Sequence, residues 1–201
     1  MKFHLIKKDL NKNQFNRLLS IIRSQNRSSI LSNLSSNNIK NYINIVIKNK
    51  NMELFIASNP KIIGYAIIAN KPDALIKYFR KLKIKIFFDL LLRFKLFTLI
   101  NIFFSLVNLD TAFLSKRNKY IIKNSVNLNL LAIERKHQGQ NLGDKFLRFI
   151  INRTNFKTKY ISCETDNFRS SKFYINKLQF RFVGYKIRIP KLFEVLIKKI
   201  Y

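Results

Sequence analysis

The segment from residue 126 to residue 151 constrains the fold most, because an apolar strand-like run passes through a polar turn into a helix-like run. The strand-like run covers residues 126–133 and the helix-like run covers residues 145–151. The turn between them contains Gln138-Gly139-Gln140-Asn141-Leu142-Gly143. A strand that turns into a helix leaves several backbone N–H groups unpaired, with the positive end of the helix dipole behind them. The pattern therefore predicts an anion cradle, suited to phosphate or pyrophosphate.

The residues around this turn make the pattern more specific. The turn follows Leu131-Ala132-Ile133 and precedes Phe146-Leu147. Together these residues resemble the acetyl-CoA-binding motif of the GNAT-fold N-acetyltransferases, which reads Arg or Gln, two residues, Gly, one residue, then Gly or Ala. Gln138 opens the motif and Gly143 closes it, but Asn141 replaces the first required Gly. Because Asn adopts left-handed conformations more readily than other non-Gly residues, the turn is expected to keep its shape.

A later block resembles a second motif of the same family. It consists of Asn167, Ser170, Phe173-Tyr174, Lys177-Leu178, Phe180 and Gly184. The family's pattern is Asn, a few residues, Ala, then Phe-Tyr-x-x-Leu-Gly-Phe and a strand that contains Gly. Gln179 stands where Gly is usual. A strand-like run at residues 160–163 separates the two blocks in the order that the family has, and the resemblance covers residues 127–188.

Composition limits the other classes of protein. With 201 residues, 47% of them hydrophobic, the chain can bury a core, and it is expected to form a single domain, residues 1–201. A single cysteine, Cys163, excludes an internal disulfide. Two histidines give little material for a metal cluster or a Ser-His-Asp triad, so no metal site is predicted. Cys163 falls in a strand-like run and is expected to be a buried apolar residue.

The formal net charge of +29 has two explanations. Lys, Asn and Ile are frequent along the whole chain, which is a compositional bias, or the charge attracts phosphates, anionic lipid or nucleic acid. Basic residues are spread throughout without an RNA-binding signature, so nucleic acid is disfavoured as a partner. Residues 1–10 are charged and lack the apolar core of a signal peptide, which predicts a cytoplasmic protein.

Residues 72–118 are expected to form a helical insert that the plain family pattern does not need. Residues 74–109 are helix-prone and rich in Phe, Leu, Ile and Lys, with a polar stripe at Lys81, Lys85, Asp89 and Arg93. The longest uncharged run, residues 96–109, has 14 residues, fewer than the ~20 that a membrane-spanning helix needs. A basic, apolar helix of this kind can lie on an anionic membrane. Packing on the core and a homodimer surface are the alternatives.

The rest of the chain is a series of helices and strands. Helices are expected at residues 10–23, 39–47, 144–155 and 167–178, and strands at residues 2–6, 52–58, 61–70, 125–135, 160–163 and 181–189. The tail, residues 192–201, is expected to be a last strand or helix. The resemblance implies the α/β GNAT fold, with a mixed, mostly antiparallel central sheet flanked by helices.

The resemblance also implies a reaction, the transfer of an acetyl group from acetyl-CoA, as co-substrate, to a primary amine. The pyrophosphate would bind the backbone N–H groups of Gln138, Gly139, Gln140, Asn141, Leu142 and Gly143. The pantetheine would pair with the chain near Ala132 and Ile133, and an N–H group there would polarise the thioester carbonyl. Asn167 would hydrogen-bond the pantetheine arm, unless it only caps a helix.

Proton transfer is assigned to two side chains. Tyr174 is the expected acid for the departing thiolate, because a phenol remains protonated at neutral pH; otherwise its ring only covers the core. Glu134 is the candidate base for the attacking amine because it directly follows the cofactor-binding strand. Glu53 and Asp110 are alternatives, since geometry decides between bases.

The acceptor amine is the least constrained part. The first hypothesis is an amino sugar nucleotide of cell-envelope biosynthesis, because the basic, aromatic insert resembles those of enzymes that act there and a cationic cleft suits such a small molecule. The rival hypothesis is the amino terminus or a lysine of a protein. A hypothesis from another class is a membrane-peripheral acyl-CoA-binding protein that no longer catalyses, suggested by Asn141 and Gln179.

Overall fold

The structure is a computed structural model that describes residues 1–26, 29–70, 83–107, 109–153 and 158–200. The chain divides into two compact units. The first unit comprises Met1–Ala69 and Leu128–Phe156, and the second comprises Asn70–Asn127 and Lys157–Tyr201. Each unit has its own strands, helices and buried side chains.

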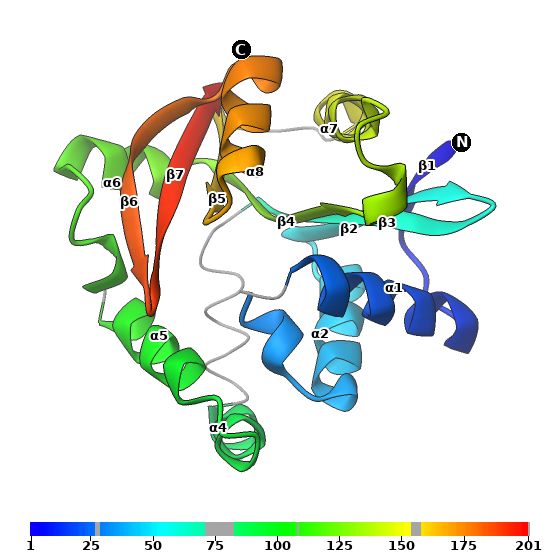
Figure 1. The fold of residues 1–201 in the computed structure, drawn as a ribbon, viewed down its shortest axis with the longest axis horizontal. Coiled ribbons are helices and arrows are strands. Elements are labelled where there is room, and N and C mark those ends of the chain that lie inside the picture. The colour runs from blue at the N-terminus through cyan, green and yellow to red at the C-terminus, as the bar shows by residue number, and fades with distance from the viewer. Residues whose placement is uncertain (27–28, 71–82, 108, 154–157, 201) are drawn as a thin grey trace. The chain divides into compact units, whose positions relative to one another are not determined.

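The first unit contains the strands that carry the predicted cradle. In chain order its elements are β1 (Lys2–Ile6), α1 (Lys12–Gln25), η1 (Leu31–Asn33), α2 (Ser36–Lys48), β2 (Met52–Asn59), β3 (Lys61–Ala69), most of β4 (Val126–Ile133), η3 (Arg135–His137) and α7 (Leu142–Arg153). The strands follow the order β1-β2-β3-β4, and β2 pairs antiparallel with both β1 and β3. Figure 1 shows α1 and α2 on one side of these strands and α7 on the other.

Side chains on both faces of β2 are buried, which explains why this strand lacks an alternating pattern. Successive side chains of a strand point to opposite faces. Phe55 meets Phe149 of α7 edge-on, with ring centroids 6.3 Å apart. Its neighbours Leu54 and Ile56 are also buried, on the opposite face, and α2 contacts β2. On β1, Phe3 stacks on Phe146 of α7 at 5.1 Å.

Helix α1 begins where its sequence signals indicate. The Asn11 side chain accepts a hydrogen bond from the Gln14 amide at 2.9 Å, and the Asn11 amide donates to the Gln14 side chain at 3.1 Å. This reciprocal pair is a capping box, which satisfies amides that a helix start leaves unpaired. Leu18, Ile21 and Ile22 form the buried face of the helix. The helix expected at residues 10–23 is confirmed, shifted by two residues.

The second unit contains the remaining strands. Its elements are α4 (Lys83–Leu92), α5 (Leu96–Leu106), η2 (Leu109–Thr111), α6 (Lys116–Lys123), β5 (Tyr160–Thr165), α8 (Phe168–Lys172), η4 (Phe173–Lys177, a turn of π-helix), β6 (Arg181–Arg188) and β7 (Lys191–Lys199). The strand order is β5-β7-β6, and β7 is antiparallel to both neighbours. The tail, expected to be a strand or a helix, is therefore a strand, which runs beside β6 in Figure 1.

A network of charged groups lies inside the second unit. The Glu164 carboxylate on β5 meets Lys186 Nζ and an Arg188 guanidinium nitrogen on β6, both at 2.6 Å. Lys186 also lies 4.0 Å from the buried carboxylate of Asp110. Burial alone raises the pKa of Glu164, but the charges and hydrogen bonds of Arg188 and Lys186 outweigh it and lower this pKa to about 2. Glu164 is therefore ionised at neutral pH.

The expected insert is helical in its described part. Two helices, α4 and α5, occupy most of residues 83–107, and they are separated at Phe94, whose φ is +52°. Of the predicted polar stripe, Arg93 and Asp89 form an ion pair at 3.1 Å, whereas Lys81 lies outside the described residues. Residues 72–82 of the insert also lie outside them. Helix α6 continues beyond residue 118, where the insert was expected to end.

The predicted fold class is confirmed. In the part of the chain that the structure describes, seven strands follow the order β1-β2-β3-β4-β5-β7-β6 in a mostly antiparallel sheet flanked by helices. Within the described residues, no helix is both long and apolar enough to span a bilayer.

Candidate functional site

The turn from β4 into α7 exposes a run of main-chain donors. The amides of residues 139–144 have no hydrogen-bond acceptor among the described residues, and the first amide of the helix that is paired is that of Lys145, which donates to the Asn141 carbonyl at 3.2 Å. Gly139 and Asn141 both have positive φ, +82° and +57°. Residues 139–141 are exposed. Unpaired N–H groups at a helix start, reachable from solvent, form an anion-binding site.

Gln138 braces this turn. Its side-chain amide donates to the Ile133 carbonyl at 2.7 Å and to the Gln25 side chain at 3.2 Å. Its backbone N–H already donates to the Arg135 carbonyl at 3.1 Å. Of the residues predicted to offer backbone donors, Gln138 is therefore the one whose amide is already used, while those from Gly139 to Gly143 remain available.

The end of β4 lies very close to β3. The Glu134 amide donates to the Ile63 carbonyl at 2.8 Å. A Cβ atom added at Gly64 would lie 2.8 Å from the Ala132 carbonyl oxygen and 2.5 Å from the Ile133 side chain. Only glycine permits this approach, because real Cβ atoms do not come within 3.0 Å of other heavy atoms. Gly64 thereby sets the position of Ala132 and Ile133, a role that the sequence pattern did not signal.

Arg17 connects α1 to the residue that follows β4. Its guanidinium donates to the Ile62 carbonyl at 2.9 Å and meets the Glu134 carboxylate at 2.5 Å. Lys136 and His137 lie 3.7 and 3.8 Å from the same carboxylate. Burial raises the pKa of Glu134, but the Arg17 hydrogen bond and charge, with smaller contributions from Lys136 and His137, hold that pKa below its usual range.

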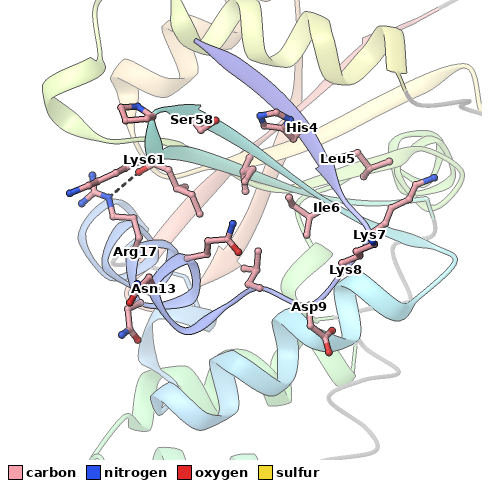
Figure 2. A pocket seen from close by; sticks show the side chains of 16 residues that line it. His4, Leu5, Ile6, Lys7, Lys8, Asp9, Asn13, Arg17, Ser58 and Lys61 are labelled. Carbon is pink, nitrogen blue, oxygen red and sulfur yellow. Dashed lines mark hydrogen bonds between the residues drawn. The ribbon is translucent and has the colours of Figure 1, made fainter.

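A pocket of about 990 Å³ opens beside Arg17. It is lined by β1, the segment that leads from β1 into α1, the first half of α1, and the ends of β2 and β3. Figure 2 shows Arg17 and Lys61 at one end of the pocket and Lys7 and Lys8 at the other. The one acidic residue of its lining is Asp9. The pocket therefore favours an anionic ligand.

The second unit contains Tyr174 and Asn167. Tyr174, in η4, is 7% exposed, and its ring lies edge-on to Phe173 and Phe180 at 5.4 and 5.3 Å. Its hydroxyl has no hydrogen-bond partner among the described residues. Burial, and to a lesser degree the neighbouring Cys163, raise the pKa of Tyr174 well above its usual value. Turns of π-helix are frequent at functional sites.

Asn167 caps α8. Its side-chain oxygen accepts hydrogen bonds from the amides of Arg169 and Ser170 at 2.9 and 3.4 Å. The helix-capping alternative for Asn167 is thus present in the structure, and its contact with pantetheine stays a prediction.

The remaining candidate residues belong to other elements than the cradle turn. Cys163, on β5, is buried as expected, and burial together with Glu164 raises the pKa of its thiol well above the usual value. Of the alternative bases, Glu53 lies near the start of β2 and Asp110 lies in η2 beside Lys186.

Both departures from the family's glycine pattern occur at positive φ. Asn141 has φ +57° and Gln179 has φ +58°. Glycine adopts such conformations without steric cost, and a side chain adopts them at some cost. The two motifs therefore keep the backbone shape that the family's glycines imply, although the residues differ.

Solved structures give the same fold. A polyamine N-acetyltransferase from Drosophila melanogaster superposes with a TM-score of 0.61 at 11% identity, over 98% of this chain and 100% of that one. A protein from Desulfovibrio desulfuricans, described as an acetyltransferase of the GNAT family, gives 0.59 at 8% identity over the whole of both chains. The NatC complex bound to Gag peptide and CoA gives 0.54 at 12% identity, over 99% of each chain.

The sequence alone gives no such match. No protein-family model matches the chain, and no curated protein matches it. The chain nevertheless has the fold of the GNAT acetyltransferases, as its two motifs predicted.

Proposed function

We propose that the chain is an N-acetyltransferase that moves an acetyl group from acetyl-CoA to a primary amine. The observation that carries this proposal is the run of unpaired amides at residues 139–144, of which residues 139–141 are exposed, at the start of α7 in a fold shared with acetyltransferases. The NatC structure, which has the same fold, contains CoA. When bound, acetyl-CoA supplies an activated acyl group as its thioester.

The residues present fit the diphosphate of such a cofactor. An anion of this kind needs several N–H donors that point one way and a site free of intruding side chains. Where a Cβ atom at Gly139 would stand, no other atom lies within 4 Å. The amides from Gly139 to Gly143 would hold the phosphates, and the main chain at Ala132 and Ile133 would pair with the pantetheine arm and polarise the thioester carbonyl.

Tyr174 is the proposed acid. Its phenol is protonated at neutral pH, and burial, which raises its pKa further, makes it a weaker acid than an exposed phenol. No described residue uses the hydroxyl as a hydrogen-bond donor, so it remains available to a ligand. Tyr174→Phe should lower turnover roughly 10²–10⁴-fold, with little change in acetyl-CoA affinity.

Tyr65→Phe is the matched control, because the Tyr65 hydroxyl donates to Asn26 at 2.9 Å and has no proposed role in proton transfer. It should cost stability of about 1 kcal/mol and leave turnover unchanged. Equal turnover in Tyr174→Phe and the wild-type protein would remove Tyr174 from the mechanism.

Glu134 remains the proposed base, and its surroundings determine how strong a base it is. The carboxylate is ionised and can accept a proton, but its lowered pKa makes it a weaker base than an ordinary glutamate. Glu134 lies next to the cradle turn in the sequence. It also contacts Arg17, which lines the cationic pocket, so Glu134 is linked to both the turn and the pocket.

The cationic pocket supports an anionic acceptor. Lys7, Lys8 and Lys61 offer three ammonium groups, and a nucleotide diphosphate attached to an amino sugar matches that charge. Amino termini and lysines of proteins are the alternative acceptors. A mass-spectrometric screen of both classes for the gain of one acetyl group tests the proposal.

Gly139→Val tests whether the cradle turn binds acetyl-CoA. It should abolish most acetyl-CoA binding, because a β-branched side chain strains a backbone with positive φ and intrudes beside the phosphates. Thermal unfolding of the variant separates loss of binding from loss of folding. Binding equal to wild type would place the cofactor elsewhere.

The alternative function, an acyl-CoA-binding protein that no longer catalyses, predicts a different result in the same screen. A protein of that class would bind acetyl-CoA and acetylate no member of the amine panel. Its motivation was Asn141 and Gln179, but both keep the left-handed backbone of the glycines that they replace. The two substitutions therefore give no support to a loss of activity, and the amine panel separates the two alternatives.

A further inference from the structure

Helix α5 exposes its apolar residues and directs polar ones inward. Its exposed apolar residues are Leu96, Phe97, Ile100 and Phe103, whose spacing places them on one face of the helix. In contrast, Thr98 is buried, and the Asn101 side chain donates to the Ile189 carbonyl at 2.8 Å. In Figure 1, α5 lies beside the end of the β6–β7 hairpin that contains Ile189. A surface helix of a water-soluble domain normally has the opposite arrangement.

Helix α4 continues the apolar surface. Ile86 and Leu90, four residues apart, form its buried side. The other residues from 87 to 92, apart from Asp89, are apolar and exposed. They are Phe87, Phe88, Leu91 and Leu92. Two consecutive helices that contact each other, α4 and α5, therefore both expose several large apolar side chains. Exposed apolar side chains that gather in this way can mark a binding surface.

The turn between α4 and α5 carries the most exposed member of this group. Phe94 is 87% exposed and has φ +52°, although bulky residues rarely adopt positive φ. Its amide donates to the Leu91 carbonyl at 3.0 Å, and that of Lys95 donates to the Leu90 carbonyl at 2.9 Å, so the conformation is fixed by the turn. Strained residues of this kind are frequent at functional sites.

Two cations flank Phe94. Arg93 pairs with Asp89 on α4 and keeps 44% of its side chain exposed, and Lys95 is exposed. Apolar side chains at the tip of a helical turn, with cations on either side, match the boundary between the acyl chains and the headgroups of an anionic bilayer.

The net charge distinguishes two possible partners of this surface, a second copy of the chain and an anionic bilayer. A second copy of the chain would bring another net charge of +29 against the first, which opposes association through a surface flanked by cations. An anionic bilayer attracts that charge, and its acyl region accommodates Phe and Leu. The helices α4 and α5 have 10 and 11 residues, so they suit the interface and not a span.

We infer that the α4–α5 turn, residues 91–97, inserts into the surface of an anionic lipid bilayer. Leu92, Phe94 and Phe97 enter the acyl region, while Arg93 and Lys95 contact the headgroups. This docking goes beyond acetyl transfer and places the chain at a membrane surface independently of its acceptor.

A single-tryptophan variant tests the insertion directly, because the chain contains no tryptophan. Phe94→Trp in the full chain is mixed with vesicles of phosphatidylcholine and phosphatidylglycerol. Its emission should shift to the blue and be quenched by lipids brominated on their acyl chains. Phe168→Trp is the control, since Phe168 is 71% exposed on α8, away from this turn in the sequence; its emission should not change.

Co-sedimentation with the same vesicles separates insertion from general attraction of a basic protein. Leu92→Ser/Phe94→Ser changes two side chains that are 78% and 87% exposed, so folding should be preserved. This variant should bind the anionic vesicles roughly tenfold more weakly than wild type, and Phe168→Ser should bind as wild type does. Vesicles of phosphatidylcholine alone should bind all three less.

Each contrary result overturns the inference. No co-sedimentation of the wild-type chain with anionic vesicles would do so, as would equal binding by the double serine variant. Co-sedimentation with unchanged Phe94→Trp emission would show that the net charge alone holds the protein to lipid. A dimer in sedimentation equilibrium that Leu92→Ser/Phe94→Ser dissociates would assign the surface to a second copy instead.

Discussion

Glu134 and Glu164 are each held by cations, but in surroundings that differ between the two units. Glu134 follows β4 in the first unit, and its side chain, 20% exposed, meets Arg17 at 2.5 Å. Glu164 lies on β5 in the second unit, and its side chain, 15% exposed, meets both Lys186 and Arg188 at 2.6 Å. The pKa is lowered in both, but it is lowered to about 2 for Glu164.

The difference shows that a shifted pKa does not by itself identify a functional carboxylate. Lys186, beside Glu164, is almost as enclosed as the glutamate, with 13% of its side chain exposed, so this network has little access to a ligand. Glu134 is followed by an exposed Lys136 and by the turn with unpaired amides. Perturbed groups indicate function when a pocket and further donors accompany them. This difference favours a structural role for Glu164 and supports the proposed role of Glu134 in the site.

The largest expected effect is the loss of stability when the Glu164 charge is removed. Glu164→Gln leaves the enclosed cations Lys186 and Arg188 without their carboxylate, and breaking such a pair costs roughly 3–5 kcal/mol. Urea or thermal unfolding measures this directly. Glu134→Gln is the matched control, and it should cost only about 1 kcal/mol. Equal losses in the two variants would end the distinction between the glutamates.

Acid unfolding gives the second largest effect. The folded pKa of Glu164, about 2, lies below its value of 4.5 in the unfolded chain. Its contribution to stability is therefore fully present above pH 4.5 and is lost as the pH falls from 4.5 towards 2. The loss should be of the order of 3 kcal/mol. The unfolding free energy of Glu164→Gln, measured over the same interval, should fall less steeply than that of the wild type. Parallel curves would refute the assignment.

Local patterns in the sequence predicted the backbone around Glu134 well. The strand, the turn and the helix from residue 126 onward each have a short-range signal: an apolar run, glycines with Asn141, and a second apolar run. The conformation of Asn141 follows from the same signals, since asparagine tolerates positive φ.

Contacts between distant residues had no such signal. Arg17 and Glu134 are 117 positions apart, and Gly64 meets Ala132 across neighbouring strands. The position of the break between α4 and α5 was not predicted, because Arg93-Phe94-Lys95 contains none of the glycine, proline or asparagine residues that usually end a helix. Such features depend on tertiary packing, and the local propensity of a sequence carries no information about that packing.

Gly64 provides a test of the main chain near Glu134. Gly64→Ala adds a Cβ atom that would lie 2.8 Å from the Ala132 carbonyl oxygen, so β3 and β4 must move apart. Overpacking of this kind costs about 1–3 kcal/mol, and it should also weaken acetyl-CoA binding because Ala132 and Ile133 shift. Calorimetric titration and thermal unfolding measure the two effects. Unchanged affinity in a destabilised variant would show that this part of β4 does not touch the cofactor.

The smallest expected effect concerns the proton affinity of Glu134. Arg17→Met removes the group that holds the Glu134 pKa down, so this pKa should rise towards its usual range. If Glu134 is the base, it must be deprotonated to act, and the acid limb of kcat/KM should therefore move to higher pH, by less than about 1 unit. Lys136→Met is the control, because Lys136 lies 3.7 Å from the carboxylate with 67% of its side chain exposed. Solvent screens that charge, so the limb should move less. An acid limb that stays in place in Arg17→Met would exclude Glu134 as the base and leave Arg17 with a purely structural contact.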